Sequence, residues 1–258
     1  MNNFNPKVVT KELIKFLQEW FEKNGKGCNA IIGISGGKDS TVVAGLCVKA
    51  FGKDKVIGVL MPNGKQKDIT DSIKVCEHLG IKYITVNINK AVEAAKEEIL
   101  NNLKQIGVDE LTEQTITNLP PRIRMTTLYA VGQTLNGRVL NTCNLSEDWI
   151  GYSTRYGDSA GDVAPLANLT VNEVRLVGME LGLPKELVYK VPSDGLCGKT
   201  DEDNLGFTYD VLDKYIRTGI CEDDEIKKKI DHRHKINKFK LELMPYYKYG
   251  EVMAEDKW

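Results

Sequence analysis

The sequence predicts an α/β fold, in which a doubly wound, mostly parallel sheet is flanked by helices. Two observations support this prediction. Short apolar runs alternate with amphipathic stretches through residues 7–142, and the apolar runs end in polar turns. Strands that alternate with helices in this way form a parallel sheet covered on both faces. We expect residues 1–258 to form a single domain, because a chain of this length can bury about three quarters of its unfolded surface around one core.

Hydrophobic periodicity assigns the elements in order. Apolar runs of strand length predict strands at residues 30–34, 56–61, 82–88 and 138–142. Apolar residues near helical spacing predict helices at residues 7–24, 41–51, 67–79, 90–103 and 121–135. Pro62 closes the second strand, and Gly80 ends the third helix. Residues 222–240 are densely charged, and we expect a solvated surface helix there.

The turn after the first predicted strand has the chemistry of a phosphate site. Residues 35–40 read Ser-Gly-Gly-Lys-Asp-Ser. Gly36 and Gly37 have no Cβ, so they let the backbone turn sharply and leave room for a bulky group. The amides that follow lie at a helix N-terminus, where unpaired N–H groups favour an anion. Asp39 cannot itself bind a phosphate, so we expect a cation between the two, namely Mg²⁺.

The same cluster has a structural alternative. A Ser/Gly/Asp group after a strand often forms only a turn with a helix cap, in which Asp39 or Ser40 satisfies the first amides. A cap needs neither two adjacent glycines nor hydroxyls on both sides, and this favours phosphate binding. The spacing also differs from the common G-x-x-x-x-G-K-[ST] phosphate loop.

Polar turns follow three of the predicted strands. In open parallel sheets, ligands bind beyond the carboxyl ends of the strands. We therefore expect residues 35–40, 61–64 and 142–147 to lie together on one rim of the sheet. Residues 151–162 and 194–206 are too polar for core elements, and loops of this length are usually lids, binding loops or disordered segments.

Composition narrows the class of protein. The formal net charge is −1, so no chain-wide basic field recruits nucleic acid. The cysteines form no C-x-x-C pair, which argues against a zinc site and a disulfide framework and suits a reducing cytosol. The N-terminus lacks a charged-then-apolar signal, and no apolar run approaches the ~20 residues of a membrane span. We expect a cytoplasmic protein with no nucleic-acid or membrane partner.

Several motifs, in collinear order over nearly the whole chain, resemble those of the NAD synthetase family. Residues 35–40 match the S-G-G-x-D-S loop of the adenylating ATP pyrophosphatases, the superfamily that includes it. Residues 122–125 resemble the family's R-x-R-M helix start, and residues 142–147 its T-x-x-x-x-E turn. Residues 151–157, followed by Asp162, resemble the family's G-(aromatic)-x-T-K-Y-G-D segment. Residues 190–193 resemble its K-x-P-[ST] motif, and residues 199–209 its T-D-E-x-x-L-G motif. His234-Lys235 matches a His-Lys pair near the end of the family's sequences.

The resemblance implies the adenine nucleotide alpha hydrolase-like fold and a homodimer. It implies a reaction that converts deamido-NAD, ATP and ammonia into NAD, AMP and pyrophosphate through an acyl-adenylate. Asp39 and Glu147 would be the catalytic residues that hold Mg²⁺. The implied ATP-binding residues are Gly33, Ile34, Ser35, Gly36, Gly37, Lys38, Asp39, Ser40, Thr142 and Ser193. The implied deamido-NAD-binding residues are Arg122, Arg155, Asp162, His234 and Lys235, with one subunit completing the other's site.

Taken singly, these side chains also have structural alternatives. Arg122 could be a helix-surface charge, Glu147 an acid that stabilises a helix N-terminus, and His234 a solvated histidine. The chain also departs from the family pattern, with Arg155 in place of the usual Lys and Val171 where many members carry a Lys. We consider Lys190 or Lys199 as a replacement for that lost cation, and we expect residues 194–206 to close over ATP.

Three rival functions remain at this stage. The ATP-pyrophosphatase half of GMP synthetase shares the first loop but does not need the Arg122 and 142–147 patterns. A tRNA-modifying member would carry a basic extension or paired cysteines, and a nucleotide-binding sensor has little reason to keep Asp39 with Glu147. The length leaves no room for a fused glutamine amidase domain, so we expect free ammonia as the nitrogen donor, with a separate amidase subunit as the alternative.

Overall fold

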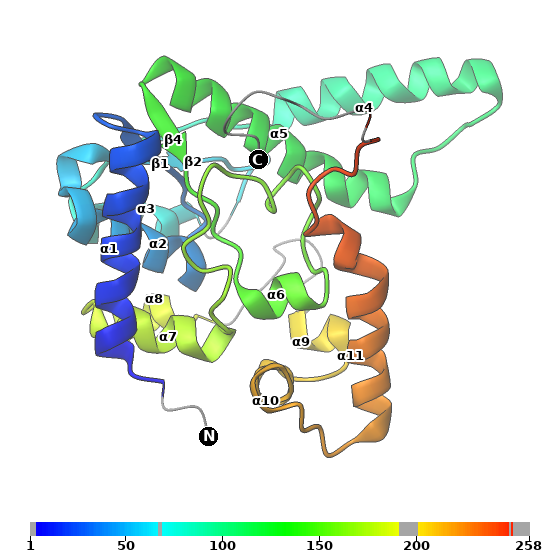
Figure 1. The fold of residues 1–258 in the computed structure, drawn as a ribbon. Coiled ribbons are helices and arrows are strands. Elements are labelled where there is room, and N and C mark those ends of the chain that lie inside the picture. Colours follow the sequence, from blue (N-terminus) through cyan, green and yellow to red (C-terminus); the bar gives the residue numbers. More distant parts are fainter. Residues whose placement is uncertain (1–3, 67–68, 191–200, 248, 250–258) are drawn as a thin grey trace.

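Four parallel strands form the central sheet, in the order β3-β2-β1-β4 (Figure 1). The computed structural model describes residues 4–66, 69–190, 201–247 and 249. The strands are β1 (Asn29–Gly33), β2 (Val56–Leu60), β3 (Lys82–Thr85) and β4 (Gly137–Val139). The predicted α/β class with a parallel sheet is therefore confirmed.

Helices follow the strands along the chain. The first five are α1 (Pro6–Asn24), α2 (Lys38–Phe51), α3 (Ile69–Leu79), α4 (Asn89–Leu103) and α5 (Glu113–Thr134). The later ones are α6 (Leu145–Trp149), α7 (Val171–Glu180), α8 (Lys185–Val188), α9 (Asp201–Leu205), α10 (Tyr209–Thr218) and α11 (Asp224–Asn237). Short 3₁₀ turns span Lys53–Lys55, Lys104–Ile106 and Lys238–Lys240. In Figure 1, α4 and the start of α5 project from the body as a two-helix arm.

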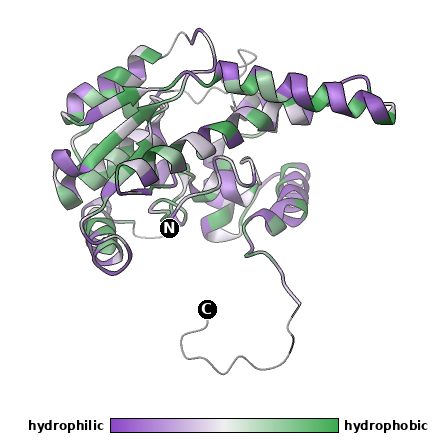
Figure 2. Ribbon diagram, turned by 90° about the horizontal axis from the view of Figure 1, so that it is seen from above, coloured by the Kyte–Doolittle hydropathy of each residue, from purple (hydrophilic) through white to green (hydrophobic). Residues whose placement is uncertain are grey.

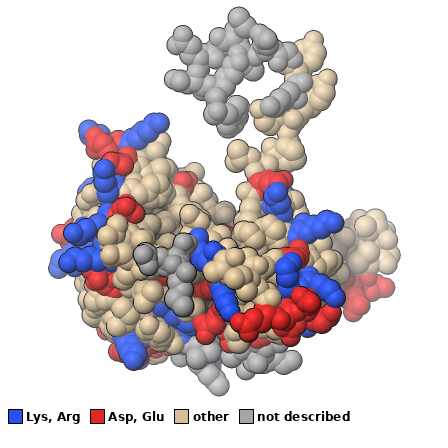
Figure 3. Space-filling model, turned by 60° about the horizontal axis from the view of Figure 1, so that its bottom comes forward, with Lys and Arg blue, Asp and Glu red and all other residues tan. Residues whose placement is uncertain are grey.

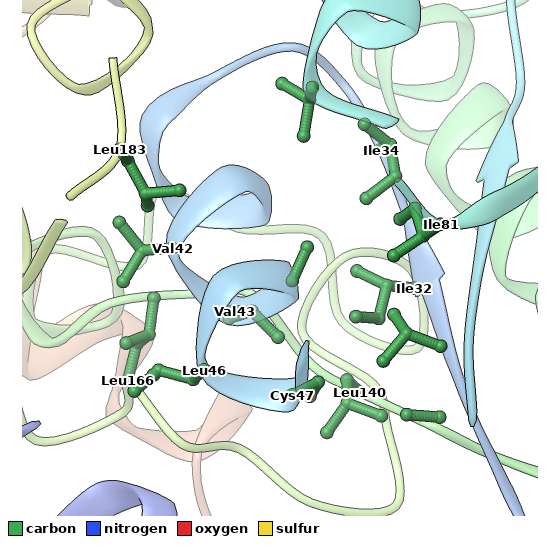
Figure 4. Packing of buried hydrophobic residues seen from close by; sticks show 14 of the residues in the cluster. Ile32, Ile34, Val42, Val43, Leu46, Cys47, Ile81, Leu140, Leu166 and Leu183 are labelled. Carbon is green, nitrogen blue, oxygen red and sulfur yellow. The ribbon is translucent and has the colours of Figure 1, made fainter. Parts of the chain in front are cut away.

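Apolar clusters cover both faces of the sheet. Neighbouring residues of a strand point to opposite faces, so each strand contributes to both clusters. Ile32 of β1 packs in a large cluster with Val43 and Cys47 of α2 (Figure 4). Ile31, one residue earlier, packs on the other face with Met125 and residues of β2 and β4. In Figure 2 the apolar colour runs along the central strands and along the helix sides that meet them. The sheet is thus doubly wound, as predicted.

A third cluster lies beyond the sheet and determines where α6 sits. Tyr209 and Leu212 of α10 are buried there with Val171 of α7 and Ile230 of α11. A buried polar contact reinforces this packing, because Asp213 accepts hydrogen bonds from the Ser146 hydroxyl and from the backbone N–H of Asn172. Helix α6, which carries Glu147, is therefore held by α7, α10 and α11.

Several boundaries differ from the predictions. Helix α5 begins at Glu113 instead of residue 121, and it continues through Pro120 and Pro121. Strand β3 ends at Thr85, and all its side chains are exposed because it lies at the sheet edge. Strand β4 ends at Val139, after which Leu140 forms a parallel bridge with Val163. The loop expected at residues 194–206 differs from the prediction, because its described end forms α9. Residues 151–162 contain no helix or strand, as expected.

Two broader features bear on the class of protein. Within the described ranges, no helix combines the length and the apolar character that crossing a membrane requires. The face drawn in Figure 3 carries blue and red side chains close together, in keeping with a formal net charge of −1.

The expected surface helix in residues 222–240 is confirmed as α11, on which only Ile230 is buried.

Candidate active site

The three predicted polar turns meet at the carboxyl edge of the sheet. Asn144, which precedes α6, donates from Nδ2 to Asp39 Oδ1 at 3.0 Å. Arg124 of α5 donates from Nε to the carbonyl oxygen of Met61 at 3.0 Å. The Asn144 contact joins the turns after β1 and β4, and the Met61 side chain packs against Gly33 at the end of β1. Because β1, β2 and β4 run parallel, the three turns lie at the same edge of the sheet, as predicted.

The loop between β1 and α2 has an open helix N-terminus. Helix α2 begins at Lys38 with Gly37 as its N-cap, and among the described residues no side chain makes a capping hydrogen bond there. Ser40 instead donates from Oγ to the carbonyl oxygen of Gly37 and lies 3.1 Å from the Ser35 hydroxyl. The cap explanation for Asp39 and Ser40 therefore fails, and first-turn amides of α2 are left for an anion.

Asp39 and Glu147 come together across a lysine. Lys38 Nζ lies 2.8 Å from Asp39 Oδ2 and 3.7 Å from Glu147 Oε1. The Lys38 side chain is 3% exposed, and each carboxylate side chain is 18% exposed. Burial alone would lower the pKa of Lys38, but the charges of Asp39 and Glu147 outweigh it, so the pKa is raised above its usual value.

The carboxylate pair has the chemistry of a magnesium site. Carboxylate oxygens are the ligands that Mg²⁺ takes from proteins, and the remaining positions are usually filled by water and substrate phosphates. In the described part of the chain, no group of three or more His, Cys, Asp and Glu side chains gathers to enclose a metal. Asp39 and Glu147 thus fit an ion that also binds phosphate, and Asp39 lies within the 35–40 turn itself.

The residues implied for the acid substrate lie around the 151–162 segment. Arg122 donates from Nε to the carbonyl oxygen of Arg155 at 3.3 Å. The Arg155 guanidinium lies over the rings of Tyr156 and Phe239. A hollow of about 540 Å³ lies beside them. It is lined by Met125, Thr126, Tyr129, Ala130, Gln133, Tyr156 and Ala160.

Asp162 has a structural role in this region. Its carboxylate accepts hydrogen bonds from the backbone N–H of Val139 at 2.7 Å and from the Tyr129 hydroxyl at 3.2 Å. Burial, together with Asp162, raises the pKa of Tyr129 to about 12. These contacts hold the 151–162 segment against β4, next to the hollow.

His234 and Lys235 lie on α11, beside α6. The His234 ring stacks on Trp149 with 4.1 Å between centroids, and its Nδ1 lies 2.9 Å from the Trp149 carbonyl oxygen. Lys235 is exposed. The structure therefore brings His234 close to the helix that carries Glu147.

Thr142 is partly buried between β4 and α6, whereas Ser193 and Lys199 lie outside the described residues.

Arg175 is a residue that the sequence reasoning missed. Gly178 of α7 packs on Val42 of α2, and the next turns pair Leu181 with Gly45, so Arg175 lies beside the start of α2. Because of this proximity, its positive charge acts to lower the pKa of Lys38. Its Nε is buried and has no hydrogen-bond partner within the described ranges. The sequence did contain a signal for Arg175: it lies about one helical turn after Val171, the position where many family members carry a lysine.

Many family members carry a lysine at the position of Val171, and the structure shows what lies at that position and at Lys190. Val171 is fully buried in the apolar cluster, so no cation lies at that position. Lys190 forms an ion pair with Asp71 at 2.8 Å, and Asp71 borders Gly36 of the phosphate loop. Lys190 is thus close to the loop, and its role as a replacement cation stays a prediction.

Asp148 gives this region a pH-dependent stability. Its Oδ1 is buried and has no hydrogen-bond partner in the part of the chain that the structure describes. Burial, and then the charge of Asp158, raise its pKa from 3.8 to about 6. Because the folded state holds this proton more tightly than the unfolded state, stability falls as the pH rises from about 4 to about 6.

We predict that Asp148→Asn stabilises the protein by about 1–3 kcal/mol at pH 8, where the wild-type carboxyl is ionised. Urea unfolding at pH 8 and at pH 5 measures the effect. The gain should shrink at pH 5, where the wild-type carboxyl keeps its proton when folded. An equal gain at both pH values would contradict the raised pKa.

Comparison with known proteins gives consistent matches. The model of the NAD synthase family matches residues 9–245. The NH(3)-dependent NAD(+) synthetase of Thermococcus sibiricus is 44% identical over 212 residues, which cover 81% of this chain and 79% of that protein. The NH(3)-dependent NAD(+) synthetase of Finegoldia magna is 38% identical over 238 residues, which cover 89% and 94%.

Solved structures agree in fold over nearly the whole chain. An NMN synthetase from Francisella tularensis has a TM-score of 0.84 and 31% identity, with 96% of this chain and 100% of that chain covered. An NH3-dependent NAD synthetase from Campylobacter jejuni has a TM-score of 0.74 and 27% identity, with 95% and 100% covered.

Proposed function

Because the chain belongs to the NAD synthase family, we infer that it is a ligase that uses ATP and ammonia to convert deamido-NAD into NAD. The observation that carries the inference is the meeting of Asp39 and Glu147 beside the open N-terminus of α2. Phosphate-binding amides and metal-binding carboxylates are both needed to transfer AMP from ATP. A sensor that only binds nucleotide needs no such carboxylate pair.

The proposed reaction has two steps. A carboxylate is a poor acyl donor because oxide is a poor leaving group. The nicotinate carboxylate attacks the α-phosphorus of ATP, which releases pyrophosphate and forms an acyl-adenylate. Ammonia then attacks the activated carbonyl and displaces AMP, which leaves the amide. Both NAD and AMP are therefore products, and no nucleophilic side chain is required.

The residues of the loop and rim divide this work. Amides at the start of α2 would bind the pyrophosphate as negative charge builds on it. Asp39 and Glu147 would hold Mg²⁺, which neutralises charge on the phosphates. Thr142 and Ser193 would contact ATP as the family resemblance implies. Arg175 would meet a phosphate at the same loop, which its buried Nε supports, since it has no hydrogen-bond partner among the described residues.

The acid substrate would lie on the side of α5 and the 151–162 segment. Arg122 and Arg155 supply positive charge beside the hollow, and Asp162 holds the segment in place. His234 and Lys235 would complete this side, from the same or a second subunit.

The α4–α5 arm carries exposed apolar residues, of which Ile106 and Ile116 are examples. We propose that this arm packs on a second copy, which sedimentation equilibrium of the full chain tests.

Arg122→Ala is predicted to raise the KM for deamido-NAD at least about tenfold, because a charge-assisted contact is worth roughly 1.5–3 kcal/mol. The KM for ATP should change much less. Initial rates with each substrate varied in turn measure both constants. Equal increases in the two constants would instead indicate a general disturbance of α5.

A second candidate substrate follows from one structural match. The F. tularensis NMN synthetase superposes with a higher TM-score than the C. jejuni NAD synthetase. The corresponding acid for this chain would be nicotinate mononucleotide, which lacks the adenylate half of deamido-NAD. The same site chemistry would serve both acids.

The deciding experiment supplies ATP, Mg²⁺ and ammonium together with one acid at a time. Deamido-NAD should give NAD and AMP in equal amounts, with no ADP. Nicotinate mononucleotide as the better substrate, judged by kcat/KM, would favour the second candidate. Xanthosine monophosphate tests the GMP synthetase alternative, and absence of AMP release with every acid would refute the proposed activity.

A further inference from the structure

Lys38 occupies the space between the two carboxylates that are proposed to hold the metal. Its Nζ is 2.8 Å from Asp39 Oδ2 and 3.7 Å from Glu147 Oε1, and its side chain is 3% exposed. The Tyr209 ring lies 5.9 Å from the same Nζ. This is a buried ammonium with two anionic partners, and the sequence placed it only among the residues that bind ATP.

The carboxylates themselves are held in position by Asn144. The Asn144 side chain donates to Asp39 Oδ1 at 3.0 Å, and its Oδ1 accepts the backbone N–H of Glu147 at 3.1 Å. One amide thus connects the loop of α2 with the start of α6. The pair of carboxylates is therefore prepared before any ligand binds, and Lys38 serves as its counter-ion.

An ammonium and a divalent ion compete for such a pair. A divalent ion that binds both carboxylates would compete with the lysine ammonium for Asp39 Oδ2 and Glu147 Oε1. Displacing the ammonium without a new anionic partner would leave a buried charge unpaired, which costs several kcal/mol. Arg175 adds positive charge nearby, which further disfavours an ammonium that has left its two carboxylates.

Nucleotide phosphates at the start of α2 would supply that missing partner. We propose that Lys38 is an internal counter-ion which closes the metal site of the free enzyme, so that divalent metal binds tightly only when nucleotide phosphates accept the lysine. This inference rests on the proposed function, because it takes Asp39 and Glu147 as the metal ligands. It makes metal binding conditional on ATP.

Binding of Mn²⁺ to the nucleotide-free protein tests the inference without any reaction. Isothermal titration and the electron paramagnetic resonance of free Mn²⁺ both report its affinity. Wild type should bind weakly, and Lys38→Met should bind at least about tenfold more tightly, a difference of about 1.4 kcal/mol. Lys38→Gln carries the same test if the Met variant does not fold, and circular dichroism melts establish which variants are folded.

Two controls separate the possible causes. Lys190→Met removes a lysine that also lies near the phosphate loop but pairs with Asp71, so its Mn²⁺ affinity should stay within about twofold of wild type. Asp39→Asn should abolish the tight binding in the Lys38→Met background.

Mn²⁺ binding that depends on Asp39 but is unchanged by Lys38→Met overturns the inference alone. An equal gain in Lys190→Met and Lys38→Met also overturns it, because the effect would then be general charge. Binding that survives Asp39→Asn in every background overturns the inference together with the proposed metal site.

Discussion

Asp39→Asn is expected to lower the rate of AMP release at least about 100-fold, because it removes a negative charge from the proposed metal site while keeping the shape of the side chain. Loss of one group that stabilises developing charge typically costs 10²–10³ in kcat, roughly 2.7–4 kcal/mol. The amide that replaces the carboxylate could still accept the hydrogen bond that Asn144 donates to Asp39 Oδ1 at 3.0 Å, so the loop should keep its position. Lys38 keeps Glu147 as an anionic partner, so the protein should still fold, at some cost in stability from the lost Asp39 charge.

The measurement is the initial rate of AMP formation at saturating ATP and deamido-NAD. Asp71→Asn provides a matched control, because Asp71 is an acid next to the same loop that pairs with Lys190. We expect it to retain more than a tenth of the wild-type rate. If Asp39→Asn also retains more than a tenth, Asp39 is not a ligand of the catalytic metal.

Gly36→Ala is expected to destabilise the protein by about 2–5 kcal/mol and to weaken ATP binding. Gly36 has a φ of +77°, a region that costs an L-residue roughly 1–2 kcal/mol. A Cβ there would lie 2.8 Å from the backbone nitrogen of Ser72 and 3.0 Å from the Asp71 Cβ. The phosphate loop or α3 would have to move, at a cost of typically 1–3 kcal/mol more.

Gly37→Ala is the matched control, although the sequence presents the two glycines as equals. Gly37 has an ordinary φ of −85°, and within the described ranges an added Cβ would meet only the Ser35 hydroxyl, at 3.3 Å. Its free energy of unfolding without nucleotide should change by less than about 1 kcal/mol. Urea unfolding of both variants compares them, and equal losses would show that the backbone at Gly36 is not under the constraint described.

Local patterns in the sequence predicted the frame of the fold. Residues 30–34 and 56–61 were identified as strands because continuous apolar runs of that length are buried on both faces of a parallel sheet. Predictions were weaker where tertiary contacts override local preference. The pattern predicts a helix over residues 121–135, yet α5 begins at Glu113, where Thr112 caps it, and it runs through Pro120 and Pro121. Strand β3 was placed through residue 88 but ends at Thr85, at the sheet edge.

The candidate site divides in the same way. The resemblance to the family identified Asp39 and Glu147, and the structure brings them to one place. The burial of Lys38 between them could not be predicted, and neither could the buried Nε of Arg175, which has no hydrogen-bond partner in the described part of the chain. Each depends on residues far apart in the chain, which α6 and α7 carry to the start of α2.

By itself, the sequence determined the alternation of strands and helices, the Ser-Gly-Gly-Lys-Asp-Ser turn and the family. These features depend on hydrophobic periodicity and on the chemistry of adjacent residues, both of which are local. Only the tertiary structure decided that Gly36 and not Gly37 is conformationally constrained, and that Lys38 is paired with the carboxylates. Packing decides such matters, because the energy of a buried charge or of a close contact depends on neighbours that the fold brings together.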